Sequence, residues 1–201
     1  MMHALKRGAR GLTAAALTTL ALVGMAAPAA SAHPVDVTEG TLTYLPSSKL
    51  IAKLTGLRLT LRGERLPVAG GGYSFHRLDD GGGGEILTAG DVVIAGEGKR
   101  VRLANPVLTV PPAAKGSLPT GGELSVLIGG ERVPLATLGL AGYAPYSLYP
   151  GTPARGFGGI VAKLGPVAAE LLNERFGVRA FRVGLPFGQL AVRCTIAEAG
   201  H

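Results

Sequence analysis

Clusters of glycine and proline interrupt this chain at short intervals, and the segments between the clusters alternate apolar with polar residues. The 201 residues include 32 glycines and 14 prolines, and two of the dense clusters are "VAGGGYSFHRLDDGGGGE" and "PPAAKGSLPTGG". Alternation with a period of two is typical of a strand with one buried face, and glycine and proline mark the turns between strands. The sequence therefore predicts a mainly β protein, an antiparallel two-sheet sandwich or an open barrel.

Two segments are predicted to form hairpins. "DVVIAGEGKRVRLAN" alternates on both sides of a turn at residues 96–99, with Val101 and Leu103 facing inward. "GELSVLIGGERVPLATLGL" turns at Gly129-Gly130, which permits the positive φ angles that a two-residue turn needs. Pro134 in the return strand has no N–H to donate and indicates an edge or a bulge.

Further strands are predicted on either side of these hairpins. "GTLTYL" places Leu42 and Tyr44 on the face opposite two threonines, and "GLRLTLRG" alternates leucine with polar residues. "FRVGL" and "GQLAVRCTI" are predicted as closing strands. The core of this arrangement is expected to contain Leu57, Leu59, Leu61, Val101, Leu103, Leu190, Val192 and Cys194.

A single segment has the pattern of a helix. "GPVAAELLNERFG" places Pro166 in the first turn and Gly177 just past the end, which predicts one short C-terminal helix over residues 166–176. Its apolar face is expected to contain Val167, Leu171 and Leu172.

The first 32 residues have the three parts of a secretory signal peptide. Lys6, Arg7 and Arg10 precede an apolar run that ends in the small-residue triplet Ala30-Ser31-Ala32. We therefore expect a signal peptide over residues 1–32 and a single secreted β domain over residues 33–201. No membrane span is expected in the mature form, because no second long apolar run follows.

The charge of the mature domain is mildly positive. The chain carries a formal charge of +7, of which the signal peptide contributes +3, leaving +4 for residues 33–201. This excess is too small for a nucleic-acid footprint and no recognition motif accompanies it, so nucleic acid is excluded as a partner. Four arginines occupy solvent-facing positions of predicted strands and would form a basic face for anionic envelope polymer if the strands are neighbours: Arg58, Arg62, Arg100 and Arg102.

The residues that carry catalysis in common enzyme classes do not form a constellation here. The chain has no Gly-x-Ser-x-Gly elbow and no P-loop, and the spacing of Asp79, Asp80 and Glu85 does not suit calcium. The only cysteine, Cys194, lies on the apolar side of an alternating segment and is expected to be buried. The sequence predicts a protein that is not an enzyme and has no cofactor.

Part of the chain resembles a known family. "GEILTAGDVVIAGEGKRVRLANPVLTV" followed by "GELSVLIGG" resembles the middle of secreted actinobacterial β domains of the HtaA type, and "PVAAELLNERFGVRAFRVGLPFGQLAV" is similar to their closing segment. The resemblance covers roughly residues 85–196 and implies an extracellular haem-binding β domain. The expected His-Gly step before "VRLANP" is replaced by Thr88-Ala89-Gly90-Asp91, so no haem ligand is carried over from the family.

Three function hypotheses follow. The leading one is a non-catalytic domain that interacts with the cell surface or envelope. The second is an extracellular carrier of haem or another small ligand, with Tyr73 and His76 in the glycine-rich loop, or the Tyr143–Tyr149 loop, near the ligand. The third is a copper protein that uses the amine and ring nitrogens of an N-terminal His33.

Overall fold

The computed structural model of the protein describes residues 35–74, 83–112, 114, 117, 119–140, 146–147 and 154–197. The elements in chain order are β1 (Val35–Pro46), α1 (Ser48–Gly56), β2 (Thr60–Arg62), β3 (Arg65–Ser74), β4 (Gly83–Thr88), β5 (Asp91–Gly96), β6 (Lys99–Val110), β7 (Gly121–Ile128), β8 (Glu131–Gly139), β9 (Tyr146–Ser147), β10 (Ala154–Leu164), α2 (Pro166–Phe176) and β11 (Pro186–Ile196).

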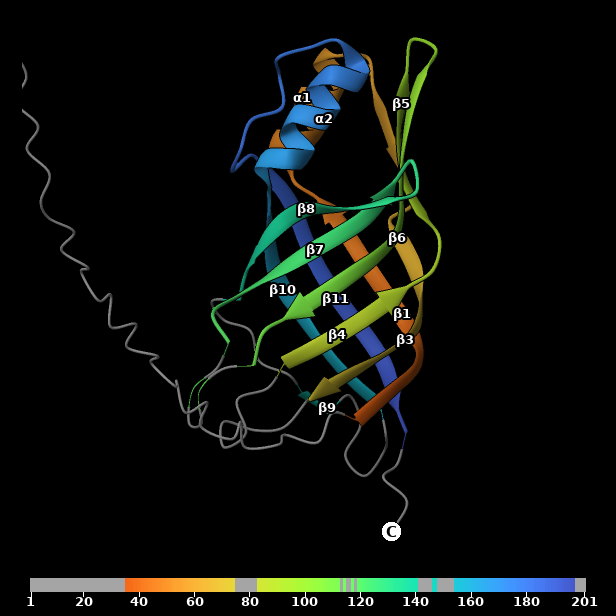
Figure 1. The fold of residues 1–201 in the computed structure, drawn as a ribbon, viewed down its shortest axis with the longest axis vertical. Coiled ribbons are helices and arrows are strands. Elements are labelled where there is room, and N and C mark those ends of the chain that lie inside the picture. The colour runs from red at the N-terminus through yellow and green to blue at the C-terminus, as the bar shows by residue number, and fades with distance from the viewer. Residues whose placement is uncertain are drawn as a thin grey trace, which may run out of the picture.

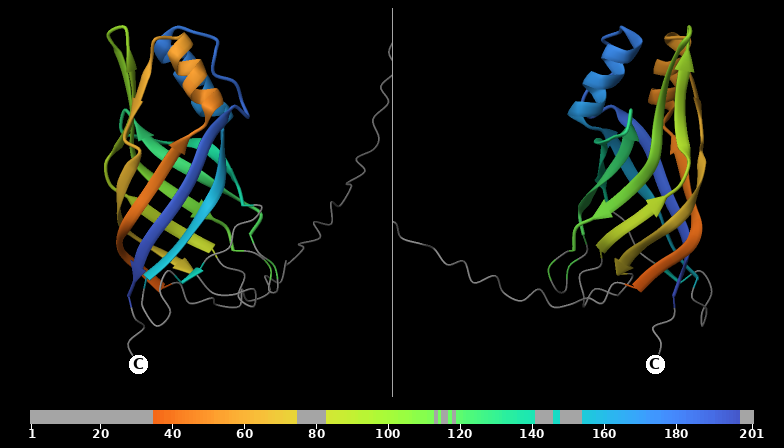
Figure 2. Two further views of the ribbon diagram at one scale, coloured as in Figure 1. Left: turned by 180° about the vertical axis from the view of Figure 1, so that it is seen from behind. Right: turned by 45° about the vertical axis from the view of Figure 1, so that its right-hand side comes forward.

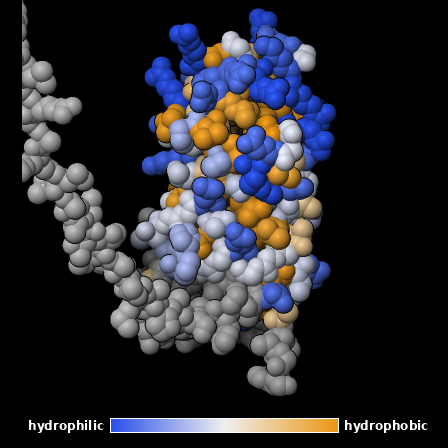
Figure 3. All heavy atoms as spheres, in the orientation of Figure 1, coloured by the Kyte–Doolittle hydropathy of each residue, from blue (hydrophilic) through white to orange (hydrophobic). Residues whose placement is uncertain are grey.

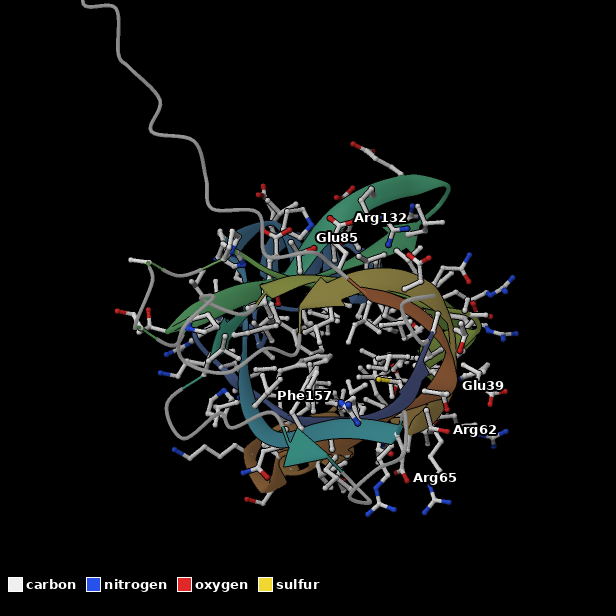
Figure 4. The ribbon with its side chains drawn as sticks, turned by 90° about the horizontal axis from the view of Figure 1, so that it is seen from below. Glu39, Arg62, Arg65, Glu85, Arg132 and Phe157 are labelled. Carbon is white, nitrogen blue, oxygen red and sulfur yellow. The ribbon has the colours of Figure 1, made fainter. Side chains whose placement is uncertain are left out.

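The strands form one antiparallel sheet, which confirms the mainly β, antiparallel prediction. Its order is β2-β5-β6-β4-β3-β1-β11-β10-β8-β7, with β9 beside β10, and β6 also pairs with β7. The pairings therefore return to β6 through eight strands. In Figure 4 these strands surround inward-pointing side chains, and in Figures 1 and 2 both helices lie at one end of the strands, beside the β5–β6 hairpin.

Strand β6 changes its neighbour part-way along its length. Its first half pairs with β5, from Lys99 to Ala104, and its second half pairs with β4, from Val107 to Val110. A register shift against β7 lies between these halves, where Asn105 has φ +44°. Asparagine tolerates this left-handed conformation better than most residues. The Asn105 bulge therefore lets one strand serve both the closed circuit and the β2–β5 extension.

Apolar side chains from every long strand fill the space inside the circuit. Leu59, Val101, Leu103, Leu190, Val192 and Cys194 are buried as predicted, whereas Leu57 and Leu61 are only partly buried. The rings of Tyr44 and Phe187 stack in this core with centroids 5.1 Å apart. The Tyr44 hydroxyl donates to the Phe187 carbonyl oxygen at 2.7 Å, so the buried hydroxyl is satisfied.

Helix α1 was not predicted, and it ends at Gly56, where the segment expected to be a strand begins. The Ser47 hydroxyl caps it by accepting from the Leu50 amide at 3.0 Å, and Leu50 and Leu54 are buried four residues apart. The chain leaves the helix through Arg58, which has φ +54°. The prediction that "GLRLTLRG" is one strand was therefore wrong, because only Thr60–Arg62 pairs with a neighbour.

Helix α2 has the predicted bounds, and Gly177 ends it with φ +69°. Its buried face differs from the prediction: Val167 is 48% exposed, and the helix buries Ala168, Ala169, Leu172 and Phe176. "FRVGL" forms a turn rather than a strand, with Gly184 at φ +77° and a bond from the Leu185 amide to the Arg182 carbonyl oxygen.

Both predicted hairpins are confirmed. The β5–β6 turn places Glu97 and Gly98 at positive φ, and the β7–β8 turn does so with Gly129 and Gly130. Pro134 lies at a register shift between β7 and β8, which is the bulge that its missing N–H predicted.

The Asn105 bulge provides a stability test. We expect Asn105→Val to lower the free energy of unfolding by about 1–3 kcal/mol, because a β-branched residue is strained at positive φ. Asn105→Gly also removes the side chain, but glycine adopts a positive φ without strain, so this variant should lose less unfolding free energy. Urea unfolding followed by circular dichroism would measure both, and an equal loss for the two variants would contradict the assigned role of the backbone conformation.

Candidate functional site

Three of the four predicted surface arginines lie on β2 and β6, the two strands that flank β5. In the β2–β5 and β5–β6 pairs, Arg62 is opposite Val93 and Val93 is opposite Arg102. Residues directly opposite each other in an antiparallel pair share a face, so Arg62 and Arg102 flank Val93 on one surface. Arg100 lies one step along the same face, opposite Ala95. Figure 4 shows Arg62 pointing away from the strands.

Arg58 reaches the same part of the molecule through a close backbone contact. A Cβ atom on Gly96 would overlap the Arg58 carbonyl oxygen and would lie 2.8 Å from Cδ2 of Leu59. Glycine at position 96 therefore allows the exit from α1 to lie against the β5–β6 hairpin. We call Arg58, Arg62, Arg100 and Arg102 the basic corner.

The charges of the basic corner are mostly unneutralised. Arg102 forms an ion pair with Asp91, with Nε 2.9 Å from Oδ2, and the two side chains are 62% and 22% exposed. An exposed pair of this kind contributes at most about 1 kcal/mol. Within the described ranges, Arg58, Arg62 and Arg100 are exposed and have no acidic partner.

The end of the molecule that carries the basic corner is rich in hydrophilic side chains. Figure 3 shows hydrophilic residues gathered there, over the helices and the β5–β6 hairpin. Lys99 of this hairpin donates from Nζ to the Phe176 carbonyl oxygen at 3.0 Å, at the C-terminal end of α2. A cation at a helix C-terminus is stabilised by the helix dipole and satisfies a free carbonyl group. This hydrogen bond therefore holds the β5–β6 hairpin against the C-terminal end of α2.

The other predicted ligand residues lie wholly or partly outside the described residues. Tyr73 belongs to β3, where its backbone pairs with Val35 and Gly84. His76 and His33 are outside the described ranges, and of the Tyr143–Tyr149 segment only β9 is described. The Tyr73–His76 site and the copper site at His33 therefore stay hypotheses. Among the described residues, no cluster of three or more His, Cys, Asp or Glu side chains is arranged to hold a metal ion.

The buried Cys194 lies between Gly40 of β1 and Arg155 of β10. Burial raises the pKa of its thiol to about 11, and the positive charge of Arg155 offsets part of this effect. The thiolate, which is the nucleophile, is therefore scarce at neutral pH. This result agrees with the predicted packing role of Cys194.

A shallow hollow on the outer face of β4, β6 and β7 was not predicted from the sequence. It has a volume of about 740 Å³, and Leu87 and Val107 line it together with two glutamates, Glu85 and Glu123. The two glutamates lie on either side of Thr109 in adjacent strands. In Figure 4, Glu85 and Arg132 point outward on the same side. These residues come together through the strand register, so no local sequence motif could have predicted the hollow.

Comparisons with solved structures find a similar fold. No protein-family model matches the chain, and no curated protein matches it. The crystal structure of the C-terminal domain of HtaA from Corynebacterium glutamicum is similar, with a TM-score of 0.52 and 14% sequence identity. The similarity covers 81% of this chain and 99% of that chain. It shows that the two share a fold, in agreement with the resemblance seen in the sequence.

No helix in the described part of the chain has the length and apolar character needed to cross a membrane.

The raised pKa of Cys194 predicts a pH dependence of stability. The pKa of this thiol is 9.0 in the unfolded chain and about 11 in the folded protein. The difference favours the folded state below pH 9, and this contribution to the unfolding free energy is lost as the pH rises toward 11. We expect Cys194→Ala to show a smaller fall in unfolding free energy than the unaltered protein over this interval. Urea titrations at a series of pH values would measure it. Parallel curves for the two proteins would contradict the prediction.

Proposed function

We propose that the protein is a secreted, non-catalytic binding domain that acts at the cell surface and attaches to anionic envelope polymer through the basic corner. The observation that carries this proposal is the strand register that places Arg62 and Arg102 on the two sides of Val93. Arg100 and Arg58 extend the positive surface along the hairpin and to the end of α1.

The geometry suits a repeating anion better than a single small one. Each guanidinium group presents a planar set of donors that matches phosphate or carboxylate. An exposed contact of this kind contributes about 1 kcal/mol or less, so useful affinity requires several contacts at once. The paired strands β2, β5 and β6 hold three of the arginines at fixed spacing, which reduces the entropy lost when a polymer engages all of them.

A second candidate function is extracellular binding of haem or another small ligand. The shared fold with the HtaA domain favours it, and the ligand side chains proposed from the sequence are Tyr73 and His76. Tyrosine and histidine are both axial ligands of haem iron in proteins. In this function the protein carries a ligand outside the cell rather than attaching to a polymer.

Replacing the basic corner tests the leading proposal. We expect the combined Arg58→Ser, Arg62→Ser, Arg100→Ser and Arg102→Ser variant to lose retention on isolated cell wall, with a nearly unchanged melting temperature, because all four side chains are at the surface. Raising the salt to about 1 M should release the unaltered protein, since the screening length falls to about 3 Å.

A pair of double variants separates location from net charge. Arg62→Ser with Arg102→Ser and Lys163→Ser with Arg193→Ser remove the same charge, the second pair from strands β10 and β11. The first pair should weaken wall retention several-fold more than the second. The proposal would be contradicted if the two double variants lost wall retention equally, or if the variant with all four arginines replaced were still retained.

Titration with hemin tests the second candidate. A Soret shift with the unaltered protein that is lost in both Tyr73→Phe and His76→Ala is expected if these side chains ligate the iron. A shift that is unchanged in the two variants would exclude them as ligands, and the lack of any shift would exclude haem.

A further inference from the structure

A groove separates α2 from the segment that follows it, residues 177–183. Its volume is about 850 Å³, and Ala169 and Phe181 contribute to its lining. Figures 1 and 2 show α2 and this segment at one end of the molecule, beside the β5–β6 hairpin. None of the four arginines of the basic corner lines the groove.

Hydrogen bonds fix the two walls of the groove relative to each other. The Asn173 side chain donates from Nδ2 to the Phe181 carbonyl oxygen at 2.7 Å and accepts from the Phe181 amide at 2.9 Å. The Val178 amide donates to the Asn173 carbonyl oxygen at 2.9 Å. The segment therefore runs back along α2 at a set distance instead of extending away from it.

The two walls carry opposite charge. Glu170 and Glu174 are exposed on the α2 wall, and Arg179 and Arg182 are exposed on the wall formed by the following segment. No ion pair joins the two rows within the described residues. The acidic row belongs to the body of the helix, and the basic row follows the helix C-terminus.

This arrangement is complementary to itself. A two-fold axis that runs parallel to the groove, in the plane of contact, exchanges the two walls, so the acidic row of one copy faces the basic row of the other, and the same contact occurs twice. A partner of different chemistry would need its own acidic and basic rows at the same spacing, and this chain already has them. Two exposed apolar side chains beside the charges, Val167 at 48% and Val183 at 66%, would lose water in the same contact.

We propose that two copies of this chain associate through the α2 groove, with Glu170 and Glu174 of each copy against Arg179 and Arg182 of the other. The contact is salt-sensitive because its charges are at the surface. It uses residues outside the basic corner, so it does not depend on the proposed attachment to envelope polymer.

Sedimentation velocity and light scattering on the purified protein test the proposal. From about 10 µM to about 1 mM at low salt, the weight-average mass should rise about two-fold, and salt of about 1 M should reverse the rise. Glu170→Arg with Glu174→Arg makes both walls basic, and Arg179→Glu with Arg182→Glu makes both walls acidic. Each variant alone should stay monomeric, because like charges then face each other.

The decisive arm mixes the two charge-reversed variants. Their equimolar mixture should form a heterodimer, because an all-basic groove then faces an all-acidic one. Lys49→Glu with Lys53→Glu on α1 is the matched control and should associate like the unaltered protein; circular dichroism verifies that each variant is folded. The proposal is overturned by a protein that stays monomeric at every concentration, by single variants that associate normally, or by a mixture that stays monomeric.

Discussion

The bulge at Asn105 allows strand β6 to have three partners, and both the closed circuit and the basic corner require all three. Along one edge β6 pairs with β7, and along the other it pairs first with β5 and then with β4. The carbonyl oxygen of Asn105 accepts from Nη1 of Arg132 at 2.7 Å, so the group that leaves the ladder remains satisfied. Without this change of neighbour, β6 would follow either β4 or β5 for its whole length.

Local chemistry made much of the fold predictable. The glycines at the turns, the missing N–H of Pro134, and the Pro166 and Gly177 signals of α2 each act within a few residues, and the structure bears them out. Helix α1 was missed because its signal is short: the Ser47 cap and the Leu50–Leu54 spacing compete with the leucine alternation that starts at Leu57. The left-handed turn at Arg58 separates the two patterns, and nothing local requires it.

The candidate surfaces were less predictable than the strands because they depend on contacts between distant segments. Alternation placed Arg62, Arg100 and Arg102 at solvent-facing positions, and the structure agrees. That Arg62 and Arg102 lie on the two sides of Val93 follows from the order β2-β5-β6, which the sequence did not establish. Likewise, Glu170 and Arg182 share a groove only because Asn173 holds the chain back against α2.

The basic corner also affects how the protein behaves at high concentration. Strand β2 lies at one end of the strand order, so it is an edge strand, and it has only three residues. An unpaired strand edge is a template for runaway pairing between molecules, and proteins guard such edges by keeping them short and placing cations on them. Arg62 on β2 and Arg58 just before it supply that charge. The guanidinium groups proposed to bind a polyanion are thus also expected to repel another β2 and to disfavour aggregation through this edge.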